Sequence, residues 1–400
     1  MSENAATAPG TTQSAAGTSV LRAALSGLCA SLIGVGLARF AYTPLIPALI
    51  AAGWFLPADA VYLQAGNLAG YLAGALLARL AARRLSAIGA LRANMVLATL
   101  AFFACATPLS FLWYLVWRFA AGLSGGMLMV LAAPVVLPHV PAARRGVIGG
   151  IIFTGVGLGI AASGTLVPLL LHLGLVATWC GLGALALVLT AIAWSGWPAG
   201  SAAVVAARSG RLPLSPALLA LCFVYALIAV GQVPHMVFLV DFVARGLGEG
   251  LATGARYWVL FGVGAALGPT LAGHVADAIG FRRALRLLLV LSAALVGVLA
   301  VASGPLALIP SSLAIGAFVP GSVVVVIGRT RELVANQPDR QQAAWSLATS
   351  AFALGQATAA YGYSWLFAGG LGHALLYAIG GAAFVLALAI DLAAAEPGGK

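Results

Sequence analysis

The chain has 400 residues, of which 62% are hydrophobic and only 7% are charged, with a mean hydropathy of +1.07. Soluble domains carry about a quarter charged residues, so this composition excludes a soluble globular protein. The net charge of +11 does not indicate a nucleic-acid-binding protein, because the basic residues stand in short clusters between apolar runs and form no basic face.

Apolar runs follow one another along almost the whole chain, and about 20 mainly apolar residues suffice for a membrane-spanning helix. The sequence therefore predicts an all-α membrane protein of twelve transmembrane helices in two six-helix halves. The first six spans are expected at 21–50, 58–82, 86–107, 110–138, 145–172 and 175–197, and the second six at 215–244, 251–279, 283–303, 305–331, 340–368 and 371–393.

The polar segments divide the chain into domains. Residues 1–20 are small and polar and are expected to form a disordered cytoplasmic tail. A Gly/Ala/Ser-rich stretch over 198–214 is expected to be a cytoplasmic linker between an N-terminal bundle, 21–197, and a C-terminal bundle, 215–393. Residues 394–400 form a second cytoplasmic tail.

The distribution of arginine and lysine predicts the orientation in the membrane. Of the 20 basic residues, 16 fall on one side of the expected spans and only Arg245 and Arg256 on the other, while Arg39 and Arg118 lie within spans. Basic residues accumulate in cytoplasmic loops. Both chain ends are therefore expected in the cytoplasm, with the protein in a bacterial-type inner membrane.

The second and eighth expected spans end in similar patterns, which indicates an internal repeat. Each pattern pairs a glycine near the end of the helix with a pair of arginines in the loop that follows. The residues are Gly74, Ala78, Arg79, Arg83 and Arg84 in the first copy, and Gly273, Asp277, Gly280, Arg282 and Arg283 in the second.

This loop pattern resembles a motif of the major facilitator superfamily, and the first copy departs from it at Ala78, where the family has Asp. Arg118 and Gly122 resemble the superfamily's arginine-bearing motif in the fourth helix. The segments GVGLARFAYTPLIP (34–47) and GNLAGYLAGALL (66–77) resemble the YbfB/YjiJ-like branch. The resemblance implies two six-helix bundles around a central cavity that work by alternating access.

Two arginines lie where a charge is expensive, so both are candidates for function. Arg39 lies past the midplane of the first span, and its alternative role is to brace the helix near Pro44 and Pro47. Arg118 lies about two turns into the fourth span, within possible reach of headgroups, and the resemblance associates it with proton coupling. No embedded acid accompanies them, and a guanidinium suits a carboxylate or phosphate. An anionic substrate is therefore favoured.

Other polar residues follow helical spacing and are expected to face a cavity or, equally, a partner helix. His235 could bind a coupling proton, although an isolated histidine is more often simply hydrogen-bonded. Asp241 is expected to pair with Arg245 at the surface, since its protonation would require a buried setting. The substrate-binding candidates are Arg39, Tyr42, Gln64, Asn67, Tyr71, Arg118, Gln232, His235, Trp345 and Gln356.

The residues of the loop pattern are expected to act in gating rather than in binding. They are Gly74, Arg79, Gly273, Asp277, Gly280, Arg282 and Arg283. The sequence has no GxxxxGK[ST] loop and no HExxH motif, and its four cysteines lie singly in apolar runs. No enzyme, metal site or cofactor is therefore expected.

The expected function is secondary active transport of a small organic solute, with an organic anion favoured and proton coupling expected. The partners are the small-molecule substrate, protons and the lipid bilayer, with the protein as a monomer and without nucleic acid. Two alternatives stay open. One is an efflux carrier for hydrophobic compounds, and the other is a membrane sensor or scaffold that transports nothing.

Overall fold

The computed structural model describes residues 10–141, 144–198, 215–334 and 338–394, and within these residues the chain is helical without strands. The helices of the first half are α1 (Gly10–Ser31), α2 (Ile46–Ala51), α3 (Pro57–Leu85), α4 (Ala87–Ala104), α5 (Phe111–Val136), α6 (Arg145–Leu171) and α7 (Leu175–Ala193). Those of the second half are α8 (Pro216–Val233), α9 (Leu239–Asp241), α10 (Gly250–Ile279), α11 (Phe281–Gly297), α12 (Pro305–Leu333), α13 (Pro338–Ala368) and α14 (His373–Ala393).

Ten helical stretches of the described chain are long and apolar enough to cross a bilayer. The two remaining expected spans coincide with α3 and α13, which have 29 and 31 residues. Both carry uncharged polar side chains along their length, such as Asn67 and Gln356, and they pack against each other between the halves. A helix that is shielded by its neighbours need not be apolar all round.

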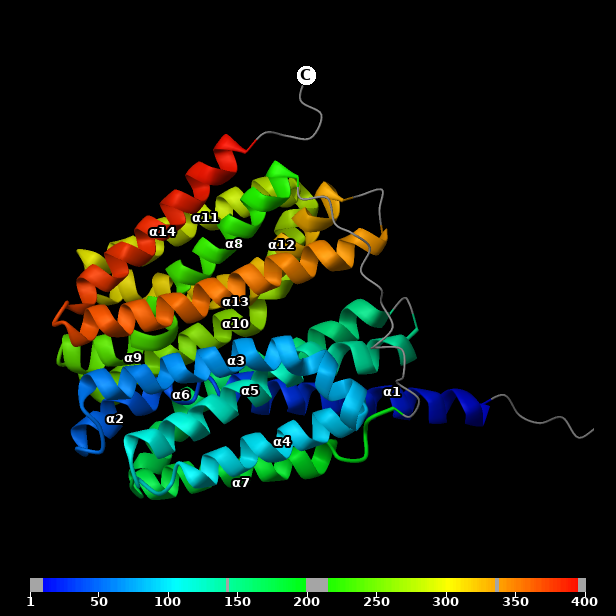
Figure 1. Ribbon diagram of the computed structural model, residues 1–400, viewed down its shortest axis with the longest axis horizontal. Coiled ribbons are helices and arrows are strands. Elements are labelled where there is room, and N and C mark those ends of the chain that lie inside the picture. The colour runs from blue at the N-terminus through cyan, green and yellow to red at the C-terminus, as the bar shows by residue number, and fades with distance from the viewer. Residues whose placement is uncertain (1–9, 142–143, 199–214, 335–337, 395–400) are drawn as a thin grey trace, which may run out of the picture.

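The helices of the two halves run along a common direction, one half beside the other (Figure 1). The end of α7 and the start of α8 lie at one end of the molecule, which we call the linker end. The loops that contain Trp54 and Arg245 lie at the other, which we call the opposite end. The expected linker falls on residues 199–214 and the tails largely on 1–9 and 395–400, which lie outside the described residues. Helix α1 begins at Gly10, within the stretch expected to be a tail.

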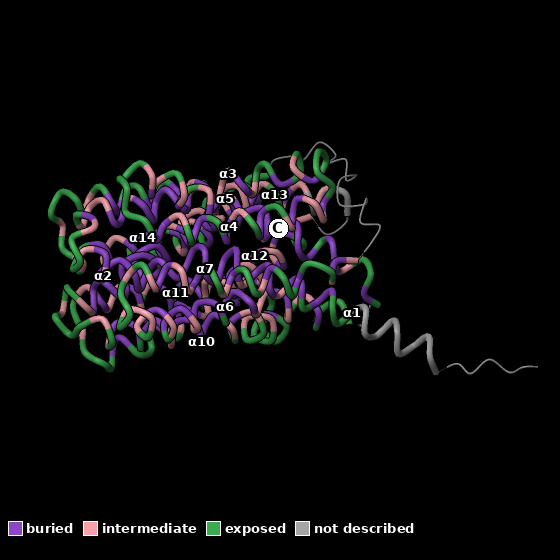
Figure 2. The backbone as a smooth tube through the Cα atoms, turned by 90° about the horizontal axis from the view of Figure 1, so that it is seen from below, coloured by how far each residue is buried: buried purple, intermediate pink, exposed green. Residues whose placement is uncertain are grey.

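Large apolar side chains remain exposed on the flanks of the bundle. Leu76 is 63% exposed, Phe223 is 65% exposed and Trp365 is 68% exposed. Figure 2 shows the buried residues along the middle of the bundle and exposed ones along its margins and at its end loops. Exposed apolar surface of this extent indicates a surface that faces lipid.

The single helix expected over 21–50 is wrong, because the first span is broken in its middle. A π-helical turn over Leu32–Leu37 follows α1, and a 3₁₀ turn over Thr43–Leu45 precedes α2. Pro44 and Pro47 lack a backbone N–H and so interrupt regular helical bonding. The seventh span is broken in a related way, with π-helical turns over Pro234–Phe238 and Phe242–Gly246 on either side of α9.

Close helix pairs repeat in the two halves. A β-carbon at Gly74 of α3 would overlap the carbonyl group of Leu123 on α5, and one at Gly268 of α10 would overlap that of Ala317 on α12. Glycine at these positions lets the two backbones touch. Helices α3 and α5 therefore have the same relation in the first half as α10 and α12 in the second, which supports the internal repeat.

Candidate functional site

The break in the first span leaves two backbone carbonyls for side chains to bind. The Thr43 N–H bonds to Phe40, three residues back, at 3.3 Å. Asn67 donates to the Ala38 oxygen at 3.3 Å, and Gln64 donates to the Arg39 oxygen at 3.2 Å. Because an unpaired carbonyl is costly in a membrane interior, the polar residues of α3 stabilise the broken helix.

Arg118 is a brace for the same break. Its Nη1 donates to the Ala38 oxygen at 3.0 Å and its Nη2 donates to Gln64 Oε1 at 2.8 Å. Its guanidinium carbon lies 4.3 Å from the centre of the Tyr42 ring, and the residue is only 1% exposed. Tyr42 itself donates its hydroxyl hydrogen to the Ala60 oxygen at 2.9 Å. Arg118 therefore binds the first half through both of its terminal nitrogens, while its Nε, like that of Arg39, has no hydrogen-bond partner among the described residues.

Arg39 is differently placed, at the boundary between the halves. Its Nη2 donates to Gln356 Oε1 on α13, at 2.6 Å. Its guanidinium carbon lies 4.9 Å from the Tyr71 ring centre and 5.0 Å from that of Phe40. The side chain is 5% exposed, and its Nε has no hydrogen-bond partner in the described part of the chain. Arg39 therefore still has N–H groups that can donate hydrogen bonds to a ligand.

Neither buried arginine has an acidic partner. Within the described ranges, the carboxylates of Asp241, Asp391 and Glu332 form ion pairs, and none of these pairs involves Arg39 or Arg118. A buried positive charge without a counterion is unstable unless an anion can join it. The surroundings of Arg39 therefore suit a negatively charged ligand.

Aromatic side chains lie on the linker side of Arg39. Tyr225 on α8 packs against Phe352 and Trp345 on α13, with ring centres 4.5 and 6.2 Å apart. Tyr71, Trp345 and Phe352 are each partly exposed. These three partly exposed rings come from both halves and leave the linker side of Arg39 less tightly covered.

The opposite side of Arg39 is closed by contacts between the halves. Thr43 Oγ1 donates to the Met236 oxygen at 2.7 Å, and Trp258 Nε1 donates to Ser163 Oγ at 3.0 Å. The rings of Tyr62 and Tyr361 lie 6.5 Å apart. The site is therefore shut toward the opposite end. Thr43, Met236, Ser163 and Trp258 were not among the sequence candidates, because only their positions in the fold distinguish them from packing residues.

Two candidates of the seventh span bond within the second half instead. Gln232 Nε2 lies 3.4 Å from the Phe318 oxygen. His235 Nε2 bonds to Ser311 Oγ at 2.7 Å, and Ser311 in turn donates to the Leu295 oxygen. Both side chains are fully buried. Gln232 and His235 contact α12 and α14, and through Ser311 the backbone of α11, and they make no hydrogen bond to Arg39 among the described residues. They therefore do not belong to the cluster of candidates around Arg39.

The expected gating residues lie near the linker end, where Gly74 packs against α5 of its own half. Arg79, Asp277 and Arg283 are exposed. Arg282 donates to the backbone oxygen of Ala394, within the second half, at 3.0 Å. A β-carbon at Gly273 would make an ordinary contact with Val324 Cγ1 at 3.9 Å, whereas Gly280 has a φ of +85° that allows the tight turn from α10 to α11.

The pairing of Asp241 with Arg245 is confirmed, but its expected place at the surface is wrong. Asp241 is fully buried, and its carboxylate binds both Arg245 and His373. His373, which the sequence did not single out, lies 132 residues further along the chain. Only the packing of α14 beside the seventh span brings the two together.

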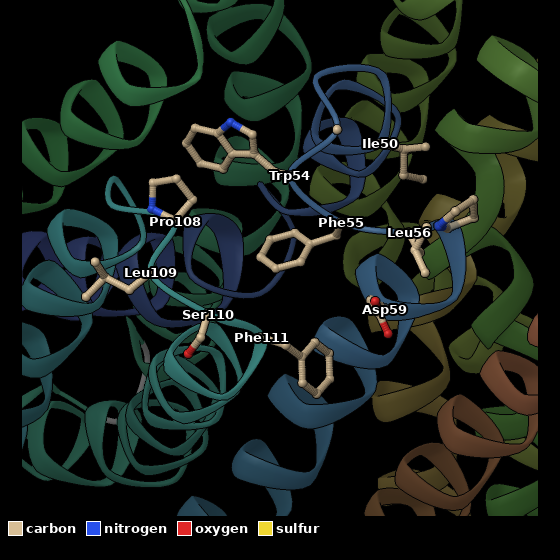
Figure 3. A pocket seen from close by; sticks show the side chains of 11 residues that line it. Ile50, Trp54, Phe55, Leu56, Asp59, Pro108, Leu109, Ser110 and Phe111 are labelled. Atoms are coloured by element: carbon tan, nitrogen blue, oxygen red, sulfur yellow. The ribbon is translucent and has the colours of Figure 1, made fainter.

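Two crevices lie at the opposite end, away from Arg39. One, of about 520 Å³, lies within the first half between residues 50–59 and 108–111. Figure 3 shows its apolar side chains, with Leu109 at one side and Asp59 at the other. The second crevice, of about 770 Å³, lies between the halves. The first half contributes Pro47, Trp54 and the turn between α6 and α7, and the second half contributes Arg245.

Comparisons with known proteins agree with this architecture. A family model described as "Uncharacterised MFS-type transporter YbfB" matches residues 31–392, which confirms the resemblance seen in the sequence. No curated protein matches the chain. The structure of the xylose transporter XylE from E. coli, in a partially occluded inward open conformation, is similar with a TM-score of 0.69 and 16% identity, over 93% of this chain and 97% of that one. At this identity the likeness shows the fold alone.

Proposed function

The chain belongs to the family of major facilitator transporters that the YbfB model describes, and we propose that it carries a small organic anion across the membrane. It is a secondary transporter rather than an enzyme, and the fold supports alternating access. We further propose twelve spans, with α3 and α13 among them, and both chain ends in the cytoplasm of a bacterial-type inner membrane, with proton coupling.

The observation that carries the anion proposal is Arg39. It is buried at the boundary between the halves, has no carboxylate partner among the described residues, and keeps an unpartnered Nε. A carboxylate or phosphate could bind its guanidinium through two parallel hydrogen bonds. Arg118 donates to Ala38 and Gln64 within the first half, so Arg39, which reaches the boundary between the halves, is the arginine that we assign to the anion.

In this proposal the anion enters from the linker end, past the partly exposed rings of Tyr71, Trp345 and Phe352. The bonds from Thr43 to Met236 and from Trp258 to Ser163 keep the opposite side shut during entry. Transport then requires these contacts to open and new contacts to form at the linker end. The exposed Asp277 and Arg283 are suited to that second closure, since charged pairs between halves can hold a gate.

Binding to purified protein tests the proposal. We expect the melting temperature to rise with at least one compound in a panel of monocarboxylates, and not with its neutral amide. Arg39→Lys should weaken this binding by about tenfold and Arg39→Ala by about a hundredfold, because a charge-assisted hydrogen bond contributes roughly 1.5–3 kcal/mol. The matched control is Arg83→Lys, at an exposed arginine of the linker end. Unchanged binding by Arg39→Ala would refute the anion site.

A further inference from the structure

A buried ionic cluster joins the end of the seventh span to the start of α14. Asp241 Oδ2 accepts hydrogen bonds from Arg245 Nη2 at 2.7 Å and from His373 Nε2 at 2.9 Å. Its Oδ1 accepts a second bond from Arg245, through Nε. We call Asp241, Arg245 and His373 the opposite-end triad. Its carboxylate therefore binds two basic side chains from two different helices.

The three side chains differ in their access to solvent. The Asp241 side chain is 0% exposed, that of His373 is 13% exposed and that of Arg245 is 30% exposed. His373 Nδ1, which lies close to Gly246, makes no recorded hydrogen bond within the described chain and is not sealed from the surface. A proton from that side can thus reach the imidazole while the carboxylate stays covered.

Few other charges face the triad. Tyr377 on α14 lies near Asp241 and is fully buried. The first-span segment Thr43–Ala51, which packs against α9, has no ionisable side chain. The remaining ionisable groups on the neighbouring segments are His235, Glu249, Arg256, Tyr257, Tyr361 and Tyr363. Among the described residues, Asp241 is the carboxylate that binds both Arg245 and His373.

We infer that the opposite-end triad is a proton-binding site, and that proton uptake loosens the closure of the halves at that end. The inference deepens the proposed function, since it names the site at which coupling to protons would act. With His373 neutral, one guanidinium balances one carboxylate. A proton passes from hydronium to His373 Nδ1, one N–H bond forms, and the hydronium leaves as water. Two cations then share a single buried carboxylate, and their repulsion is strong where water is scarce.

Arg245 is the member of the triad that can leave. It is the most exposed of the three, and it lines the crevice of about 770 Å³ between the halves. The far side of that crevice is formed by Pro47, Ala48, Ala51 and Ala52 of the first span. Arg245 also lies in the π-helical turn Phe242–Gly246, and such turns occur often at functional sites. If Arg245 leaves Asp241, its side chain therefore moves at the crevice between the two halves.

Distances between spin labels test the inference without any substrate. Ala52 lines the crevice on the first half, Ala252 follows the crevice residue Leu251 on the second half, and both alanines are exposed. Both would be replaced by labelled cysteine in the full chain, in lipid nanodiscs, with the four native cysteines changed to alanine. Lowering the pH from about 8 to about 5 should increase the long-distance population about fivefold.

Two variants separate the proton site from a merely structural cluster. His373→Gln keeps a hydrogen-bond donor but cannot take up the proton, so its population should stay at the high-pH value at both pH values. Asp241→Asn imitates loss of the negative charge and should show the long-distance population at both. His172→Gln, at an exposed histidine of the same end, should respond like the parent protein.

The inference is overturned if the parent protein shows no pH response or if His373→Gln keeps it. Should Asp241→Asn fail to fold, His373→Gln still decides the outcome. Since no substrate is present, failure of the anion site at Arg39 would leave these distances unchanged. Conversely, a pH-insensitive distance would leave the anion-binding result standing.

Discussion

Arg39 in the first half donates a hydrogen bond to Gln356 Oε1 in the second half, across 2.6 Å. Through this bond the residue that is best suited to an anion also joins the two halves. An anion that binds Arg39 must share the guanidinium with Gln356 or displace it. Binding of the substrate and contact between the halves are therefore coupled through one side chain, as alternating access requires.

Gln356→Glu should abolish anion binding while the protein stays folded. The new carboxylate would lie within ion-pairing distance of Arg39 and would neutralise the positive charge that the anionic ligand needs. We expect at least about a hundredfold loss of affinity, measured as loss of the ligand-induced rise in melting temperature. Gln356→Met, which is neutral and of similar length, should retain most of the rise. A Gln356→Glu protein that still binds the anion would contradict this prediction.

Arg118→Met should reduce stability rather than specificity. The substitution leaves the Ala38 carbonyl with only one donor and Gln64 Oε1 without its donor, both in buried surroundings. Each weakened or lost bond to a buried acceptor costs about 1–3 kcal/mol. The melting temperature should fall by more than in Arg39→Met, which frees only the Gln356 side chain. A larger fall in Arg39→Met would show that the roles of the two arginines are reversed.

Gly122→Ala should destabilise the first half, because the added β-carbon would overlap the carbonyl oxygen of Asn67 on α3. Overpacking of this kind costs about 1–3 kcal/mol. It should also disturb the side-chain bonds from Asn67 to the broken span. Gly150→Ala is the matched control, since a β-carbon there meets no atom within 4 Å. Thermal unfolding of both variants would test the prediction, and equal melting temperatures would disprove it.

Thr43→Val should favour opening at the opposite end. The variant keeps the shape of the side chain but loses the bond to the Met236 oxygen, which crosses between the halves. A loss of about 1 kcal/mol corresponds to roughly a fivefold shift in population. The Ala52–Ala252 label pair would report it as a larger long-distance population. Thr43→Ser should restore the parent distribution, and Thr165→Val, which removes only bonds within its own helix, should change nothing.

The sequence was sufficient to predict most of the architecture. Apolar runs of the required length predicted the helices, and ten described stretches pass the test for a membrane span. The expected spans at α3 and α13 do not pass that test, because these helices carry polar side chains and pack against each other between the halves. The spacing of Gln64, Asn67 and Tyr71 predicted one helical face, since residues three and four apart are neighbours on a helix, and all three side chains contact the first span.

The same spacing could not reveal what those side chains contact. The sequence predicted a helix near Pro44 that an arginine could brace, and no residue pattern indicated that the carbonyls of Ala38 and Arg39 would be freed for side chains to bind. Similarly, the i,i+4 spacing predicted the bond between Asp241 and Arg245, but His373 belongs to another helix. Burial of Asp241 accompanies the packing of that second helix, where the His373 ring lies against Phe238 and Phe242.

What the sequence by itself determined is the class of protein, its helices and the presence of two embedded arginines, because hydrophobicity and helical period are local properties of the chain. Only the tertiary structure decided which arginine is available to a ligand. Arg118 lies beside the open carbonyl of a broken helix and binds the first half through both terminal nitrogens, whereas Arg39 donates across the boundary to Gln356 in the second half. The difference arises from the distances between segments far apart in the chain, which no local pattern records.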